Sequence, residues 1–139
     1  MDEMTYVPNE LLSRLVGDRM YSVEFVLNDY VQLRFDGDRE ASGPATLNCY
    51  VWPAVDYDGR VWNEVDLGYA DALRKLVPGT VMSTSEQTGA GIRIALDTGE
   101  IVLHPTVEEV YAEIASLTGF ADEAWMVWRP GEDSFADLV

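Results

Sequence analysis

Apolar and polar residues alternate in two stretches of the chain, at residues 31–36 and 92–97. The apolar positions are Val31, Leu33 and Phe35 in the first stretch and Ile92, Ile94 and Leu96 in the second. A period of two is typical of a β-strand that has one buried face and one wet face. Each stretch ends in an Asp-Gly or Asp-Thr-Gly sequence, which favours a tight turn. The pattern therefore predicts two equivalent strands, each followed by a further antiparallel strand.

The similarity between the two halves extends to the residues before these strands. Leu12, Leu15, Val16 and Gly17 correspond to Leu73, Leu76, Val77 and Gly79, with Pro78 as an insertion. Leucines three residues apart, followed by glycine, predict a short helix over 9–16, with Asn9 as its N-cap, and a second helix over 69–77. We therefore interpret 9–53 and 69–105 as two copies of one unit.

Further segments complete each copy. Strands are predicted at 21–27 and 45–52 in the first copy and at 81–85 and 100–104 in the second.

Two regions fall outside the copies. Residues 54–67 are interpreted as an inserted arm around an Asp58-Gly59 turn. After the second copy we expect a C-terminal helix over 106–118, because Thr106 and Glu109 have the spacing of a capping box and Gly119 supplies a stop. A short strand over 124–129 follows.

The order of these elements predicts an α+β fold in a single domain, 1–139. We expect two copies of a helix plus a three-stranded antiparallel meander, related by an approximate two-fold axis, with the C-terminal helix and short strand added. A parallel doubly wound sheet is disfavoured, because its strands would be continuously apolar and separated by crossover helices.

Charge narrows the classes of partner. The chain has 25 acidic and 9 basic side chains, a formal net charge of −16, and the excess is shared evenly between its halves. A negative field of this size repels phosphate backbones and anionic lipid headgroups and attracts basic surfaces. We therefore expect a basic protein partner, with no direct nucleic acid and no membrane contact. The oligomeric state stays open.

Few residues suggest chemistry. Cys49 and His104 are each the only residue of their kind, so no zinc-binding spacing exists. A Cys49–His104 catalytic pair would require the two to meet, whereas the simpler interpretation is a core cysteine and a strand-end histidine. No cofactor and no metal are expected, and the chain is interpreted as non-enzymatic. A single cysteine and the lack of a basic, apolar leader favour a cytoplasmic protein.

Aromatic and acidic residues are the remaining candidates for a site. Trp125 and Trp128 lie three positions apart in a predicted strand, so one faces the core and the other faces out. Exposed aromatic rings among carboxylates would form a contact surface for a basic protein. The candidate partner-binding residues are Trp52, Asp56, Tyr57, Asp58, Trp62, Trp125 and Trp128.

Three motifs of the chain resemble those of other small proteins. The Leu15-Val16-Gly17 break, the alternating run 31–37 and the ending 125–130 resemble those of a loose group of small uncharacterised bacterial proteins, some of them similar to immunity proteins of toxin systems. This resemblance implies a binding or inhibitory module.

Two other functions remain open. One is a nucleic-acid-mimicking inhibitor of a DNA-binding protein, which would need carboxylates aligned along one face. The other is a small-molecule binder or enzyme with a pocket between the repeats.

Overall fold

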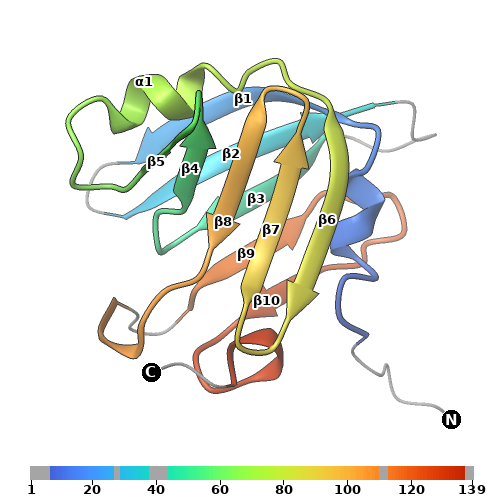
Figure 1. The fold of residues 1–139 in the computed structure, drawn as a ribbon. Helices are drawn as coiled ribbons and strands as arrows, with labels where there is room; N and C mark the ends of the chain where they lie inside the picture. Colours follow the sequence, from blue (N-terminus) through green and yellow to red (C-terminus); the bar gives the residue numbers. More distant parts are fainter. Residues whose placement is uncertain (1–6, 27–28, 38–43, 110–112, 137–139) are drawn as a thin grey trace, which may run out of the picture.

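The computed structural model describes residues 7–26, 29–37, 44–109 and 113–136. Within them the chain forms ten β-strands, one α-helix and three short 3-10 helices (Figure 1). The strands build two antiparallel five-stranded sheets. The predicted α+β fold, a helix plus meander used twice, is therefore wrong, because the protein is mainly β. Among the described residues, no helix has the length and apolar character needed to cross a membrane.

Each sheet contains strands from both halves of the chain. Sheet A has the order β1-β2-β3-β9-β10, and sheet B has the order β5-β4-β8-β7-β6. The strands of sheet A are β1 (Arg19–Val26), β2 (Tyr30–Asp36), β3 (Ala45–Cys49), β9 (Ala115–Thr118) and β10 (Met126–Trp128). Those of sheet B are β4 (Ala54–Tyr57), β5 (Arg60–Trp62), β6 (Val81–Gln87), β7 (Gly91–Leu96) and β8 (Gly99–Leu103). The helical segments are η1 (Leu12–Leu15), α1 (Tyr69–Arg74), η2 (Val107–Glu109) and η3 (Asp133–Phe135).

The two halves of the chain exchange their last hairpins. The meander β1-β2-β3 is extended in sheet A by β9-β10, the hairpin that follows the second meander. The meander β6-β7-β8 is extended in sheet B by β4-β5, the hairpin that follows the first. The segment 54–67 is therefore not an insertion peculiar to the first half, since β9-β10 is its counterpart.

Strand register repeats between the sheets. Val23 pairs with Leu33 in sheet A, and Thr84 pairs with Ile94 at the equivalent place in sheet B. A register irregularity also falls at corresponding points, at Tyr21 in β1 and at Met82 in β6. The pairs that join each exchanged hairpin to its sheet also correspond. Leu47 pairs with Leu117 in sheet A, and Ile101 pairs with Val55 in sheet B. The repetition thus lies in strand pairing more than in helices.

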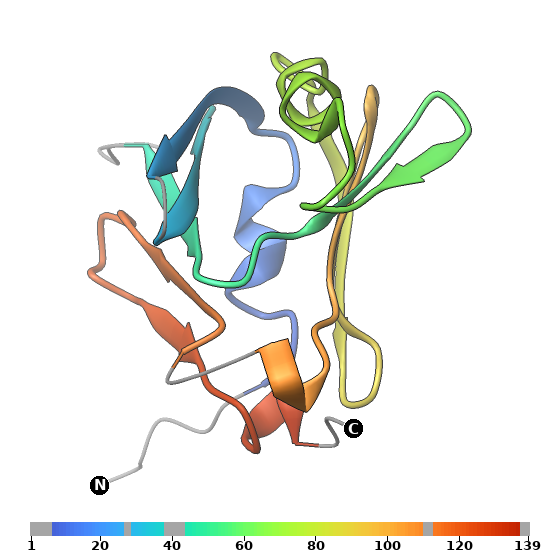
Figure 2. The ribbon, with the colours of Figure 1, turned by 90° about the vertical axis from the view of Figure 1, so that its left-hand side faces the viewer.

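One apolar core fills the space between the sheets. The inward residues of the central strands, such as Leu33, Leu47, Ile94 and Ile101, are all buried, as the alternating pattern requires. Figure 2 shows the sheets as two layers, with η1 between them and α1 at the upper margin. The sheets meet where Arg19 of β1 bridges to Thr80, just before β6.

The first predicted helix is shorter than expected. Residues 9–16 contain only the 3-10 helix η1, although Leu12 and Leu15 are fully buried as their spacing suggested. Asn9 is not an N-cap: its φ is 70°, and its side chain forms hydrogen bonds with Thr84 in β6. The second predicted helix is present as α1, which ends at Arg74.

The predicted C-terminal helix over 106–118 is wrong. The capping-box contact does form, with the Thr106 amide donating to Glu109 at 2.7 Å, but it leads only into η2. Further on, the Ile114 carbonyl accepts from the Tyr50 amide and the Ile114 amide donates to the Trp128 carbonyl, each at 2.8 Å. Pairing on both sides therefore leads the chain from Ile114 into β9, which begins at Ala115. Residues 110–112 of the prediction lie outside the described residues.

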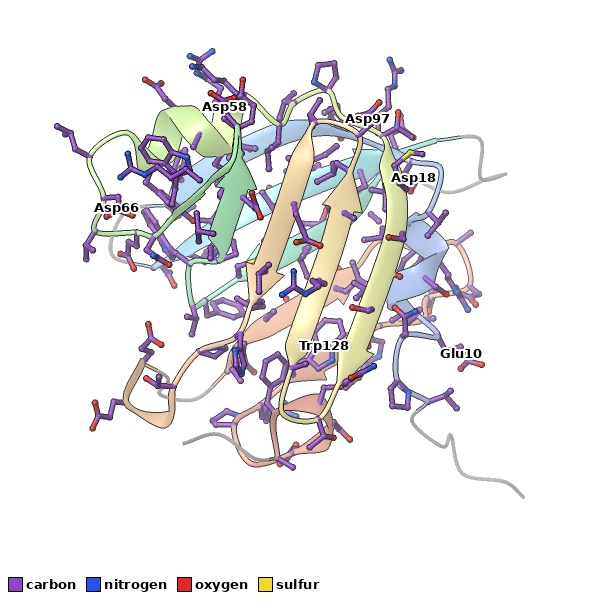
Figure 3. The ribbon with its side chains drawn as sticks, viewed as in Figure 1. Glu10, Asp18, Asp58, Asp66, Asp97 and Trp128 are labelled. Carbon is purple, nitrogen blue, oxygen red and sulfur yellow. The ribbon has the colours of Figure 1, made fainter. Side chains whose placement is uncertain are left out.

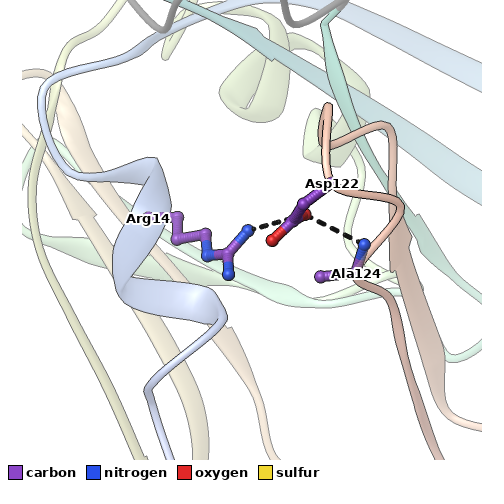
Figure 4. Close-up of polar contacts among 3 residues, drawn as sticks. All are labelled: Arg14, Asp122 and Ala124. Carbon is purple, nitrogen blue, oxygen red and sulfur yellow. Dashed lines mark hydrogen bonds and ion pairs between the residues drawn. The ribbon is translucent and has the colours of Figure 1, made fainter.

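The loop that joins β9 to β10 docks on η1. Asp122 accepts a 3.1 Å hydrogen bond from the Arg14 guanidinium and a 3.0 Å bond from the Ala124 amide (Figure 4). The Arg14 hydrogen bond is the main reason why the pKa of the Asp122 carboxyl lies below its usual value. Arg14 also lies over the Phe120 ring, 5.1 Å from its centre. These contacts link the exchanged hairpin to the first helical turn of the chain.

Candidate functional site

The hairpin β4-β5 projects from one edge of sheet B. It begins the predicted arm, 54–67, and from here on the arm also includes Gly68. Figure 2 shows this hairpin extending away from the body of the molecule. Asp58 and Gly59 connect its strands with φ values of 57° and 76°. Two consecutive positive φ angles are typical of the tight hairpin turn that matches strand twist, and Asp-Gly favours them. The predicted Asp58-Gly59 turn is therefore correct.

After β5 the arm continues as a hydrogen-bonded loop. The Asp66 carboxylate accepts from the Asn63 amide at 2.7 Å, and the Asp66 amide donates to the Asn63 carbonyl at 2.8 Å. The Asp66 carbonyl in turn accepts from the amide of Tyr69, the first residue of α1. Val65 and Leu67, on either side of Asp66, are 92% and 98% exposed. A defined loop thus presents two aliphatic side chains almost completely to solvent.

Trp62 lies beneath the arm's only basic side chain. The Arg60 guanidinium carbon is 3.8 Å from the centre of the Trp62 ring, a stacked cation–π contact. Gly68 approaches the same indole closely, since a Cβ at this position would lie 3.0 Å from a ring carbon. Gly68 also has a φ of 96°, which disfavours any other residue there. The ring is therefore held between the hairpin and the start of α1.

The base of the arm is anchored by aromatic packing. Tyr69 is buried, and its hydroxyl donates a 2.6 Å hydrogen bond to the Pro53 carbonyl just before β4. The Trp52 ring stacks on the Tyr69 ring, with 6.1 Å between the ring centres, and its centre lies 5.5 Å from that of Phe25 in β1. Burial raises the pKa of the Tyr69 hydroxyl, and Cys49 and then Glu64 add to the shift. The arm is thus fixed to both the core and the edge of sheet A.

Negative charge is concentrated on the arm and on the start of α1. Residues 54–71 contain five acidic side chains and one basic one, which gives 1 − 5 = −4. Figure 3 places Asp58 and Asp66 at the margin of the molecule, well separated from Trp128. The members of this acidic group are Asp56, Asp58, Glu64, Asp66 and Asp71.

The outward faces of the sheets, by contrast, contain mostly small or uncharged residues. On the central strands of sheet A, the outward row Gln32, Asn48 and Ser116 is uncharged, and Gln32 donates to Asn48 at 3.0 Å. On sheet B, Arg93 pairs with Glu100 at 2.5 Å, which neutralises both charges. Acidic residues therefore mark the arm more strongly than the faces beside it.

The structure separates the predicted site residues into two groups. Asp56, Tyr57, Asp58 and Trp62 belong to the arm, and Trp52 supports its base. Tyr57 is half-buried, with the Lys75 ammonium 5.7 Å from its ring centre. The two remaining candidates, Trp125 and Trp128, lie on and beside β10 in the other sheet.

The two C-terminal tryptophans have opposite environments. Trp125 is 64% exposed and Trp128 is fully buried. The Trp128 indole donates a hydrogen bond to Glu86 in the interior. Trp128 therefore cannot contact a partner and is removed from the candidate partner-binding residues. Because the β9-β10 hairpin extends sheet A, Trp125 is not part of the arm.

Sequence reasoning missed three exposed apolar residues of the arm, Val61, Val65 and Leu67. Val61 is 55% exposed and pairs with Asp56 on the outward side of the hairpin. The sequence predicted only an arm over 54–67, and β5 ends at Trp62, so Val65 and Leu67 lie in the loop after this strand. We define the arm surface as the exposed side chains of Asp58, Arg60, Val61, Glu64, Val65 and Leu67.

The other chemical candidates do not converge. Cys49 is fully buried in β3, and burial raises the pKa of its thiol to about 12, so it carries almost no thiolate at neutral pH. His104 is exposed beyond the end of β8 in the other sheet. Among the residues that the structure describes, no three His, Cys, Asp or Glu side chains are grouped so that they could hold a metal ion.

No family model matches this chain, and no curated protein or solved structure matches it either. The functional assignment therefore depends on the chain's own geometry and charge.

Proposed function

We propose that this protein is a non-enzymatic binding or inhibitory module that holds a basic protein partner through the arm surface. The observation that carries this proposal is the near-complete exposure of Val65 and Leu67 on a hydrogen-bonded loop among carboxylates. Single exposed aliphatic residues are common on protein surfaces. Two of them on a hydrogen-bonded loop suggest a contact whose ordering cost is already met before binding.

Charge supports a basic rather than an acidic partner. The arm and the start of α1 have a formal charge of −4 within a chain of −16, so a positively charged surface is attracted over long range. Acidic side chains around an apolar centre set the rate of encounter and reject wrong partners, while the apolar centre supplies affinity. Burial of one valine and one leucine contributes about 3–6 kcal/mol when it is complete.

The nucleic-acid mimic is less well supported. A mimic needs carboxylates aligned along one face, and the outward rows of the central strands contain uncharged residues and the Arg93–Glu100 pair. We therefore keep the basic protein partner as the proposal.

The test compares two variants of the purified protein as bait in an extract of its host. Val65→Ser with Leu67→Ser removes the apolar centre of the arm surface. Met82→Ser is the matched control, because Met82 is 60% exposed and lies on β6, the opposite edge of sheet B from β5. We expect a basic protein that wild type and the Met82 variant capture equally and that the double variant binds about tenfold or more weakly.

Salt provides the second criterion. Capture and the association rate of the purified pair should fall between about 0.05 and 0.5 M salt, because exposed charges are screened. Equal capture by the double variant, an acidic captured protein, or binding indifferent to salt would each contradict the proposal.

A further inference from the structure

The contact between Arg60 and Trp62 is unusual for its surroundings. Asp58 and Glu64 are exposed and lie within four residues of Arg60 along the chain, yet its guanidinium forms no ion pair with a described carboxylate. It lies instead over the Trp62 ring, with 3.8 Å between the guanidinium carbon and the ring centre. Tryptophan gives the strongest cation–π contacts of the aromatic residues.

The Trp62 ring is also positioned by its neighbours. One edge of the Trp62 indole packs beside Gly68, and the absence of a Cβ on this glycine leaves room for the ring. Its indole nitrogen is buried and has no hydrogen-bond partner among the described residues. The ring is thus positioned by packing, and the cation over its face is the end of a long, exposed side chain. Arginine side chains that are exposed and unpaired exchange between conformations readily.

We infer that the Trp62 ring is a binding site for a guanidinium group of the partner and that Arg60 occupies this site in the free protein. This inference rests on the proposed function, since it assigns a side chain of the basic partner to the ring that lies beneath Arg60 of the arm surface. The planar, weakly hydrated guanidinium of arginine stacks on aromatic rings better than the compact ammonium of lysine. A partner arginine displaces Arg60 into solvent, close to Asp58 and Glu64 in the chain. Arg60 therefore acts as an internal competitor that lowers affinity for isolated cations.

The test uses hexa-arginine as the probe and Arg60→Ala as the key variant. Removal of any positive charge strengthens the binding of a cation, so Arg74→Ala serves as the charge-matched control. Arg74 is exposed on α1 and pairs with Asp71 at 3.4 Å, away from any aromatic ring in the described contacts. We expect the Arg60 variant to bind hexa-arginine about two- to fivefold more tightly than the Arg74 variant, by calorimetry at low salt. Hexa-lysine should show a smaller difference.

A variant that lacks the Trp62 ring tests whether the gain depends on stacking. In a Trp62→Leu background, Arg60→Ala should give no more gain than Arg74→Ala, because the stacking surface is gone. Circular dichroism checks that this background is folded. A gain that persists without the ring, or an Arg60 variant no better than the Arg74 variant, overturns the inference.

A measurement on the wild-type protein avoids the ring variant. The side-chain protons of Arg60 should be shifted upfield by the Trp62 ring and should move towards their ordinary positions at saturating hexa-arginine. Retention of the shift in the bound state overturns the inference.

These results are independent of the test of the proposed function. Loss of partner capture by the Val65 and Leu67 variant supports the arm as a docking surface whatever Arg60 does. If that capture is unaffected but hexa-arginine still displaces Arg60, the cation site stands and the docking proposal fails. If hexa-arginine leaves Arg60 in place while capture depends on Val65 and Leu67, only the guanidinium site fails.

Discussion

The indole nitrogen of Trp128 donates a 2.6 Å hydrogen bond to the carboxylate of Glu86 in the protein interior. Trp128 belongs to β10 of sheet A and Glu86 to β6 of sheet B, so this bond joins the two layers. The same carboxylate accepts from the Ser134 hydroxyl at 2.9 Å and from the Asn9 amide at 2.7 Å. One acidic side chain thus ties both sheets to the segments that precede η1 and form η3.

Removal of the Glu86 carboxylate should be strongly destabilising. Glu86→Ala leaves three donors without their acceptor, and we expect a loss of about 3 kcal/mol or more in the free energy of unfolding. Glu86→Gln keeps the shape but replaces one acceptor oxygen with a donor, so a loss of about 1–2 kcal/mol is expected. Urea denaturation measures both. Glu100→Gln is the control: it breaks an outward pair with Arg93 and should cost less than about 1 kcal/mol. Equal losses at the two glutamates would contradict this role for Glu86.

The two C-terminal tryptophans should respond oppositely to substitution. Trp128→Phe removes the bond to Glu86 and leaves a small cavity, with an expected cost of about 2–3 kcal/mol. Trp125→Phe changes an exposed ring and should stay within about 0.5 kcal/mol. Acrylamide should quench the Trp125 component of the fluorescence, which disappears in the Trp125 variant. Unchanged quenching in that variant would show that Trp125 is not the accessible ring.

Two glycines of the arm should differ in their tolerance of a methyl group. Gly59 and Gly68 both have positive φ angles, at 76° and 96°, so alanine introduces backbone strain at each. Only at Gly68 does the new Cβ also lie 3.0 Å from a Trp62 ring carbon. We expect Gly59→Ala to cost about 1 kcal/mol and Gly68→Ala to cost more, by denaturation. The Gly68 variant should also alter the Trp62 fluorescence. A larger cost at Gly59 would be inconsistent with this packing.

Cys49 should make the protein less stable in alkali. Burial raises the pKa of its thiol from 9.0 to about 12, whereas the unfolded chain ionises near the lower value. Between these values the unfolded state binds fewer protons than the folded state, so the free energy of unfolding falls as pH rises above 9. In Cys49→Ala this slope should be reduced by up to about 1.4 kcal/mol per pH unit. An identical slope in the variant would indicate that the thiol does not contribute. The native thiol should also resist disulfide reagents at neutral pH until the protein unfolds.

Local sequence was informative wherever a residue's neighbours along the chain decide its structure. The alternation at Val31 and Leu33 predicted both the strand and its buried face. The Asp58-Gly59 turn was correct, because its backbone geometry depends on those two residues alone. Trp125 and Trp128 have the opposite environments that were expected, although the strand predicted over 124–129 is only Met126–Trp128 and Trp125 lies just before it.

The errors arose where a distant partner outweighed a local preference. The capping box at Thr106 and Glu109 forms, but the chain beyond it lies between β3 and β10, whose backbone groups it must satisfy. Ala115 and Leu117 are buried while Ser116 and Thr118 are less so, an alternation that the helix prediction overlooked. Asn9 had the residue type of an N-cap, yet its hydrogen bonds go to Thr84 on another strand.

By itself the sequence determined the strands at 31–36 and 92–97, their inward faces and the acidic composition of the arm, because these depend on residue type and short-range periodicity. Only the tertiary structure decided that each half gives its last hairpin to the other sheet. It also decided that Val65 and Leu67 remain in solvent while Glu86 is buried. Strand partners and burial depend on contacts between residues far apart in the chain, and these long-range contacts leave no periodic signal in either segment alone.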